Sequence, residues 1–71
     1  MNEYTITLED LLKCQSVIES IAREFGGGEL GIDFNGGRWF FTFVAGNYIT
    51  TSAGATFDEA YRAAKLAIEK V

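Results

Sequence analysis

Hydrophobic and polar positions along the chain follow two different periods. Apolar residues recur at helical spacing between residues 8 and 25, whereas residues 29–35 alternate with a period of two. Residues 38–45 are apolar on both alternations, and residues 48–53 form a third extended segment. Helical spacing returns over residues 57–71. The pattern therefore predicts the order helix, strand, strand, strand, helix.

Short signals mark the ends of these elements. Thr7 with Asp10 three residues later, and Thr56 with Glu59 three residues later, are typical of helix N-termini in which the capping side chain accepts a backbone hydrogen bond. Segments rich in glycine and asparagine end the first helix and form two tight turns, at residues 26–28, 35–37 and 46–47.

The strand pattern also predicts which residues form the core. If both turns are two-residue loops, one face of the sheet carries Leu30, Ile32, Phe34, Trp39, Phe41, Phe43 and Tyr48. The first helix is expected to face it with Leu11, Cys14, Ile18, Ile21, Ala22 and Phe25, and the second with Phe57, Ala60, Tyr61, Ala64, Ala67, Ile68 and Val71. We expect an α+β fold in one domain, residues 1–71: a two-layer sandwich with both helices on one face of a three-stranded antiparallel sheet.

The opposite face of the sheet has apolar residues of its own. Phe40, Val44 and Ile49 fall there, together with Asp33 and Arg38. Contiguous exposed apolar groups on a small domain indicate a contact surface, for another protein or for a second copy of the chain. Alternatively, the N-terminal arm of residues 1–6 folds over the patch and makes it structural.

Charge narrows the class of partner. The chain has ten acidic and six basic residues, a formal net charge of -4, which argues against general phosphate binding and favours attraction to a basic partner. Glu9 and Asp10 lie in the first turn of the first helix, where carboxylates complement the helix dipole. They also begin an acidic helical surface, which is the second place where a partner is expected to bind.

The sequence offers little catalytic chemistry. It contains no histidine, the commonest general base and metal ligand, and Cys14 falls on the apolar stripe of the first helix. We expect no enzymatic activity, no cofactor and no metal. A single cysteine allows no internal disulfide, and the first residues lack a signal peptide, so a cytoplasmic location is expected.

Residues 53–60, Ala-Gly-Ala-Thr-Phe-Asp-Glu-Ala, continue into the alanine-rich residues 63–67. This segment, with the order α-β-β-β-α, resembles the last strand and second helix of double-stranded-RNA-binding domains. Those domains place a lysine cluster at the start of this helix, where this chain has Phe57, Asp58 and Glu59. The resemblance implies RNA binding in a degenerate form, through Arg62 and Lys65. Residues 54–60 are equally similar to the helix start of HicB-type antitoxins, which bind a protein.

The size and acidity of the chain resemble those of phage-encoded inhibitors, including anti-CRISPR proteins. Together with the doubly apolar central strand, this leads us to expect a non-enzymatic protein-binding module of the inhibitor type, which blocks a basic nucleic-acid-binding surface. Binding of duplex RNA is the alternative. The residues expected to contact the partner are Asp33, Arg38, Phe40, Val44, Ile49, Glu9 and Asp10.

Overall fold

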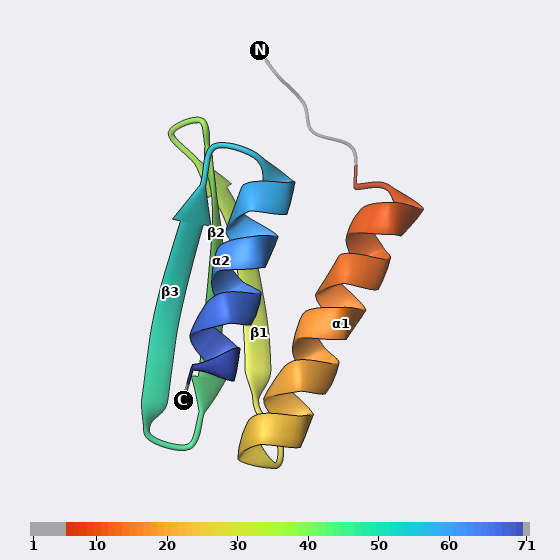
Figure 1. Ribbon diagram of the computed structural model, residues 1–71. Coiled ribbons are helices and arrows are strands. Elements are labelled where there is room, and N and C mark those ends of the chain that lie inside the picture. The colour runs from red at the N-terminus through yellow and green to blue at the C-terminus, as the bar shows by residue number, and fades with distance from the viewer. Residues whose placement is uncertain (1–5, 71) are drawn as a thin grey trace.

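The computed structural model describes residues 6–70 and shows two layers (Figure 1). One layer is an antiparallel sheet with the strand order β1-β2-β3. The elements are α1 (Leu8–Phe25), β1 (Glu29–Asn35), β2 (Arg38–Ala45), β3 (Tyr48–Gly54) and α2 (Phe57–Glu69). Both helices pack on the face of the sheet that carries the large aromatic residues. The predicted α+β sandwich and its element order are confirmed.

Two-residue turns set the register of the sheet, as predicted. Gly36 and Gly37 have φ angles of 61° and 77°, the pair of positive values that a type I′ hairpin turn requires and that glycine adopts without strain. Leu30 is consequently paired with Phe43, and Ile32 with Phe41. The face assignment that follows from this register is confirmed, and the side chains of Trp39, Phe41 and Phe43 are buried beneath the helices. The prediction that this whole face forms the core is wrong for Ile32, Phe34 and Tyr48, which are exposed.

Helix α2 lies close to the sheet because its inner side is built from small residues. Ala60 and Ala64 are buried there between Phe57 and Ile68. The Phe57 ring makes edge contacts with Trp39 and Phe41, each with ring centroids 5.1 Å apart. The predicted stripe of α2 is confirmed for these residues, with Tyr61 and Ala67 partly buried, while Val71 lies outside the described residues.

Helix α1 begins as predicted but faces the core with a different side. Its capping box is formed, with the Asp10 N–H donating to Thr7 Oγ1 at 3.1 Å. The buried apolar residues are Val17 and Ile21, whereas Leu11, Ile18 and Ala22 of the predicted stripe are exposed. That part of the prediction is wrong. Cys14 and Phe25 lie at the margin of the core and are half-buried.

A polar contact between the helices accounts for this rotation of α1. Lys65 of α2 donates from Nζ to Ser20 Oγ at 2.9 Å and to Ser16 Oγ at 3.2 Å. Ser20 is fully buried, and Lys65 is half-buried. Buried hydroxyl groups need hydrogen-bond partners, and Lys65 provides one across the helix interface. The serine flank of α1 therefore faces α2.

Candidate functional site

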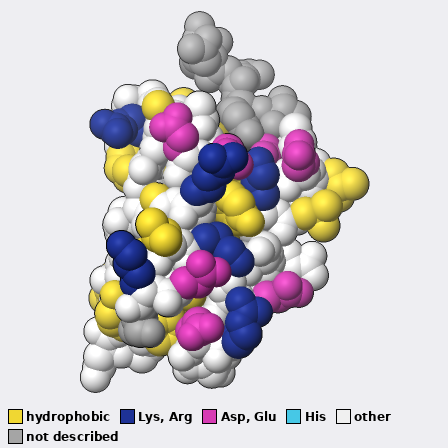
Figure 2. All heavy atoms as spheres, in the orientation of Figure 1, with side chains coloured by type: hydrophobic (Ala, Val, Ile, Leu, Met, Phe, Trp, Pro, Cys, Tyr) yellow, Lys and Arg dark blue, Asp and Glu magenta, His cyan; other side chains and the backbone are white. Residues whose placement is uncertain are grey.

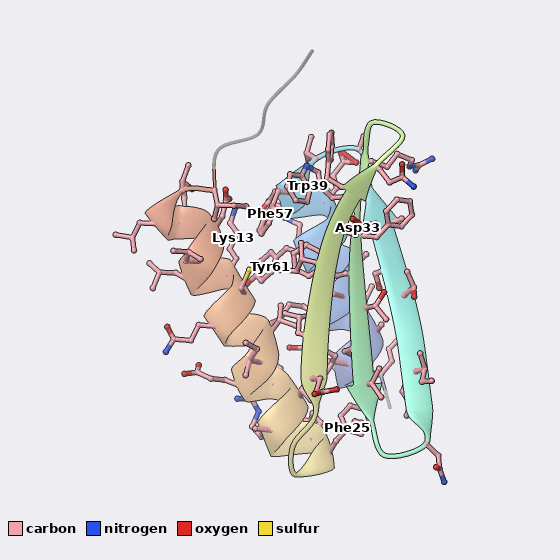
Figure 3. All side chains as sticks on the ribbon, turned by 180° about the vertical axis from the view of Figure 1, so that it is seen from behind. Lys13, Phe25, Asp33, Trp39, Phe57 and Tyr61 are labelled. Atoms are coloured by element: carbon pink, nitrogen blue, oxygen red, sulfur yellow. The ribbon has the colours of Figure 1, made fainter. Side chains whose placement is uncertain are left out.

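The open face of the sheet carries the predicted patch in two separate pieces. Ile49 lies beside Val44, and Phe40 lies two residue pairs away, beside Asp33 (labelled in Figure 3). Thr42 and Thr51 occupy the intervening position, with their hydroxyl oxygens 3.0 Å apart. Ile49 is 68% exposed, whereas Phe40 and Val44 are half-buried. The apolar part of this surface is therefore small and interrupted by polar groups.

The other predicted contact residues are divided between the two layers of the fold. Arg38 and Asp33 are exposed on the open sheet face, whereas Glu9 is exposed on α1, in the other layer. Asp10 is only 6% exposed, and its carboxylate accepts the Thr7 N–H at 3.2 Å. Its function in the structure is to cap α1. The N-terminal arm of residues 1–6 was the alternative cover for this patch. Of these residues the structure describes only Ile6, which is exposed.

Helix α1 presents more exposed apolar side chains than the open sheet face, which the sequence pattern did not predict. Four large residues on its solvent side, between 50% and 73% exposed, form what we call the outer stripe: Leu8, Leu11, Leu12 and Ile18. In Figure 2, hydrophobic side chains protrude at the right-hand edge of the view, where α1 lies. One signal was present in the sequence, because residues 8–25 contain more large apolar residues than one buried face of a helix accommodates.

A cavity of about 490 Å³ opens where the first turns of both helices meet the β1–β2 end of the sheet. Its aromatic wall contains Phe34 and Trp39, with ring centroids 4.8 Å apart, and Phe57. Trp39 and Phe57 are labelled in Figure 3. The Lys13 Nζ lies 3.1 Å from Asp58 Oδ1, and this hydrogen bond raises the pKa of Lys13. Lys13 therefore remains a paired cation at neutral pH, which is unsuited to a general base.

The remaining reactive group is also poorly placed for chemistry. Burial raises the pKa of the Cys14 thiol, and the nearby Asp10 carboxylate raises it further, so the nucleophilic thiolate is disfavoured at neutral pH. Within residues 6–70, no three side chains of the histidine, cysteine, aspartate and glutamate types are grouped to hold a metal ion. In the same part of the chain, neither helix has the length and apolar character needed to cross a membrane.

The cations considered for RNA contact are engaged within the chain. Arg62 Nε lies 2.9 Å from Asp58 Oδ2, and Lys65 donates to Ser16 and Ser20.

Comparisons with protein-family models, with curated proteins and with solved structures give no match for this chain. The candidate site therefore rests on its own geometry.

Proposed function

We propose that this chain is a non-enzymatic protein-binding module and that the outer stripe of α1 is the centre of its contact surface. The observation that carries the proposal is the polarity of α1: Asp10 and Ser20 face inward, while Leu8, Leu11 and Ile18 face solvent. Val17 and Ile21 already cover the sheet, so a helix with no further contact to make would not need large apolar residues on its solvent side as well. Large apolar side chains gathered on one exposed face indicate an interface.

The charges around the outer stripe specify the chemistry of the partner. Glu9 and Glu19 are exposed on α1, and the whole chain has a formal net charge of -4. A helix with this composition fits an apolar groove bordered by basic residues. Basic surface patches are typical of nucleic-acid-binding proteins. We therefore propose an inhibitor that acts in the cytoplasm by covering such a surface. The similarity in size and acidity to phage-encoded inhibitors such as anti-CRISPR proteins supports this narrower proposal.

The test is capture of the partner by the tagged chain from its native host, with each contact surface altered in turn. The double variant Leu11→Gln and Ile18→Gln should reduce the recovered partner at least about tenfold, because removing two central apolar contacts costs more than about 1.4 kcal/mol. The matched double variant Phe40→Thr and Ile49→Thr, on the open sheet face, should retain capture.

A control for exposed apolar residues in general is Leu66→Gln, because Leu66 is exposed on α2 away from both surfaces. Equal capture by all variants would refute the assignment to α1, and loss in the sheet variant alone would transfer the interface to the open sheet face. Sedimentation over a range of concentrations tests the homodimer. A salt-sensitive shift of duplex RNA would favour the RNA-binding alternative instead.

A further inference from the structure

Strand β1 forms an edge of the sheet in the described part of the chain. Among the described residues it pairs with β2 alone, and in an antiparallel pair every second residue turns its N–H and C=O away from the neighbouring strand. Natural edges are commonly protected by lysine, proline or a bulge. Glu29–Asn35 contains neither residue type, and its pairing runs without interruption to Asn35 opposite Arg38. The backbone of β1 is therefore suited to accept a further strand.

The helix-facing side chains of β1 are also incompletely covered. Ile32 is 38% exposed and Phe34 is 42% exposed, although their neighbours on β2 are buried. The opposite edge of the sheet differs, because Ser52 and Gly54 of β3 are small and buried beneath α2. The β1 edge therefore carries partly exposed apolar side chains that an additional strand would bury.

Helix α1 lies over the position that such a strand would occupy. Ser16 and Ser20 face α2, as their bonds to Lys65 show. Because successive helical residues are separated by about 100°, Leu11 and Ile18 fall on the opposite flank, towards the β1 edge. Figures 1 and 3 show α1 beside β1, outside the sheet and diverging from it towards the N-terminus. A strand about 4.8 Å beyond β1 would pack against this flank.

The open-face side of β1 specifies the charge of the added strand. Glu29 and Asp33 alternate there with Gly31, and both carboxylates are exposed. Residues opposite them on a neighbouring strand would gain from being basic, since a cross-strand pair of opposite charges contributes roughly 0.2–1 kcal/mol. A second copy pairing through β1 would instead bring the Glu29 and Asp33 carboxylates of both copies together at one interface. Like charges in that arrangement are destabilising.

We propose that β1 binds an extended segment of another protein by strand addition, with apolar residues of that segment beneath α1 and lysine or arginine residues opposite Glu29 and Asp33. This inference rests on the proposed protein-binding function and specifies the class of partner segment. Main-chain hydrogen bonds would provide much of the affinity, and the alternation of apolar and basic side chains would provide the specificity.

The probe is a capped nine-residue peptide in which lysine and valine alternate, titrated into the ¹⁵N-labelled full chain. We expect NMR shifts of the β1 amides and slower hydrogen exchange at Ile32 or at its neighbours, with a Kd of about 0.1–1 mM. A peptide that alternates glutamate and valine should bind about fivefold more weakly or worse, which corresponds to one cross-strand charge pair. Methylation of alternate backbone nitrogens should abolish binding of the lysine peptide.

Charge reversal in the chain provides the matched test. Asp33→Lys should reverse the preference, so that the glutamate peptide binds more tightly than the lysine peptide. Glu59→Lys makes the same charge change on the exposed surface of α2 and should leave the order of the two peptides unchanged. Ile18→Gln should weaken binding of both peptides, because it removes cover from the added strand.

Several results would overturn the inference. One is the absence of NMR shifts of the β1 amides at about 2 mM peptide, and another is NMR shifts confined to β3. A third is an order of affinities for the two peptides that Asp33→Lys leaves unchanged. Exchange protection of the outward β1 amides in the free protein would mean that the edge is already paired within the chain. A dimer abolished by Ile32→Lys would place a second copy there. If capture from the host still depends on Leu11 and Ile18, the proposed function survives any of these results.

Discussion

Gly54→Ala should destabilise the fold by about 3 kcal/mol or more, as measured by urea unfolding followed by circular dichroism. A Cβ at this position would lie 2.5 Å from Ala60 N and 2.8 Å from the Glu59 carbonyl carbon, both of them backbone atoms of the first turn of α2. Relieving this overlap requires α2 to move away from β3. Overpacking typically costs 1–3 kcal/mol and occasionally more, and an overlap with backbone belongs at the upper end because no side chain can rotate away.

Gly31→Ala is the matched control for Gly54→Ala, because both glycines lie in strands. A Cβ at Gly31 would approach only Thr42 O, at 3.8 Å, an ordinary van der Waals distance. Its stability should change by less than about 0.5 kcal/mol, as for other exposed positions. A domain of this size has a total stability on the order of 4–10 kcal/mol, so Gly54→Ala removes a substantial part of it. Equal unfolding midpoints would contradict the close approach of α2 to β3.

The sheet could be predicted from the sequence because its determinants are local. Gly36 and Gly37 permit a two-residue turn, and a turn of that length fixes the pairing register of both strands it joins. Once the register is fixed, a period of two assigns each side chain to a face. The helix starts at Thr7 and Thr56 were predictable for the same reason, since an N-cap bonds to residues within one turn.

The orientation of α1 could not be predicted because it depends on a contact between distant residues. Lys65 and Ser20 are 45 positions apart in the chain, and their hydrogen bond forms only after both helices have packed. The hydrophobic periodicity of α1 did not distinguish the two orientations, because the pair Leu11 and Ile18 and the pair Val17 and Ile21 both recur at helical spacing. The candidate site was missed as a consequence, because two residues of the outer stripe, Leu11 and Ile18, had been assigned to the core.

Adjacent residues of α1 provide the sharpest test of this orientation. Val17→Asp should destabilise the fold by at least about 3 kcal/mol, or leave the chain unfolded, because Val17 is fully buried and an unpaired carboxylate there loses its hydration. Ile18→Asp makes a nearly identical chemical change one position further along. Its effect should stay below about 1 kcal/mol, since half of the Ile18 side chain is already in water.

Thermal unfolding followed by near-ultraviolet circular dichroism measures both variants, because the packing of Trp39 and Phe57 reports on the core directly. The orientation expected from the sequence pattern would make Ile18→Asp the damaging change, since that pattern placed Ile18 in the core. The order of the two effects therefore decides which flank of α1 faces the sheet. A stable Ile18→Asp chain would also show that the side chain at position 18 is free to contact a partner. Loss of binding in a variant of the outer stripe can be assigned to that surface only if the variant keeps its fold.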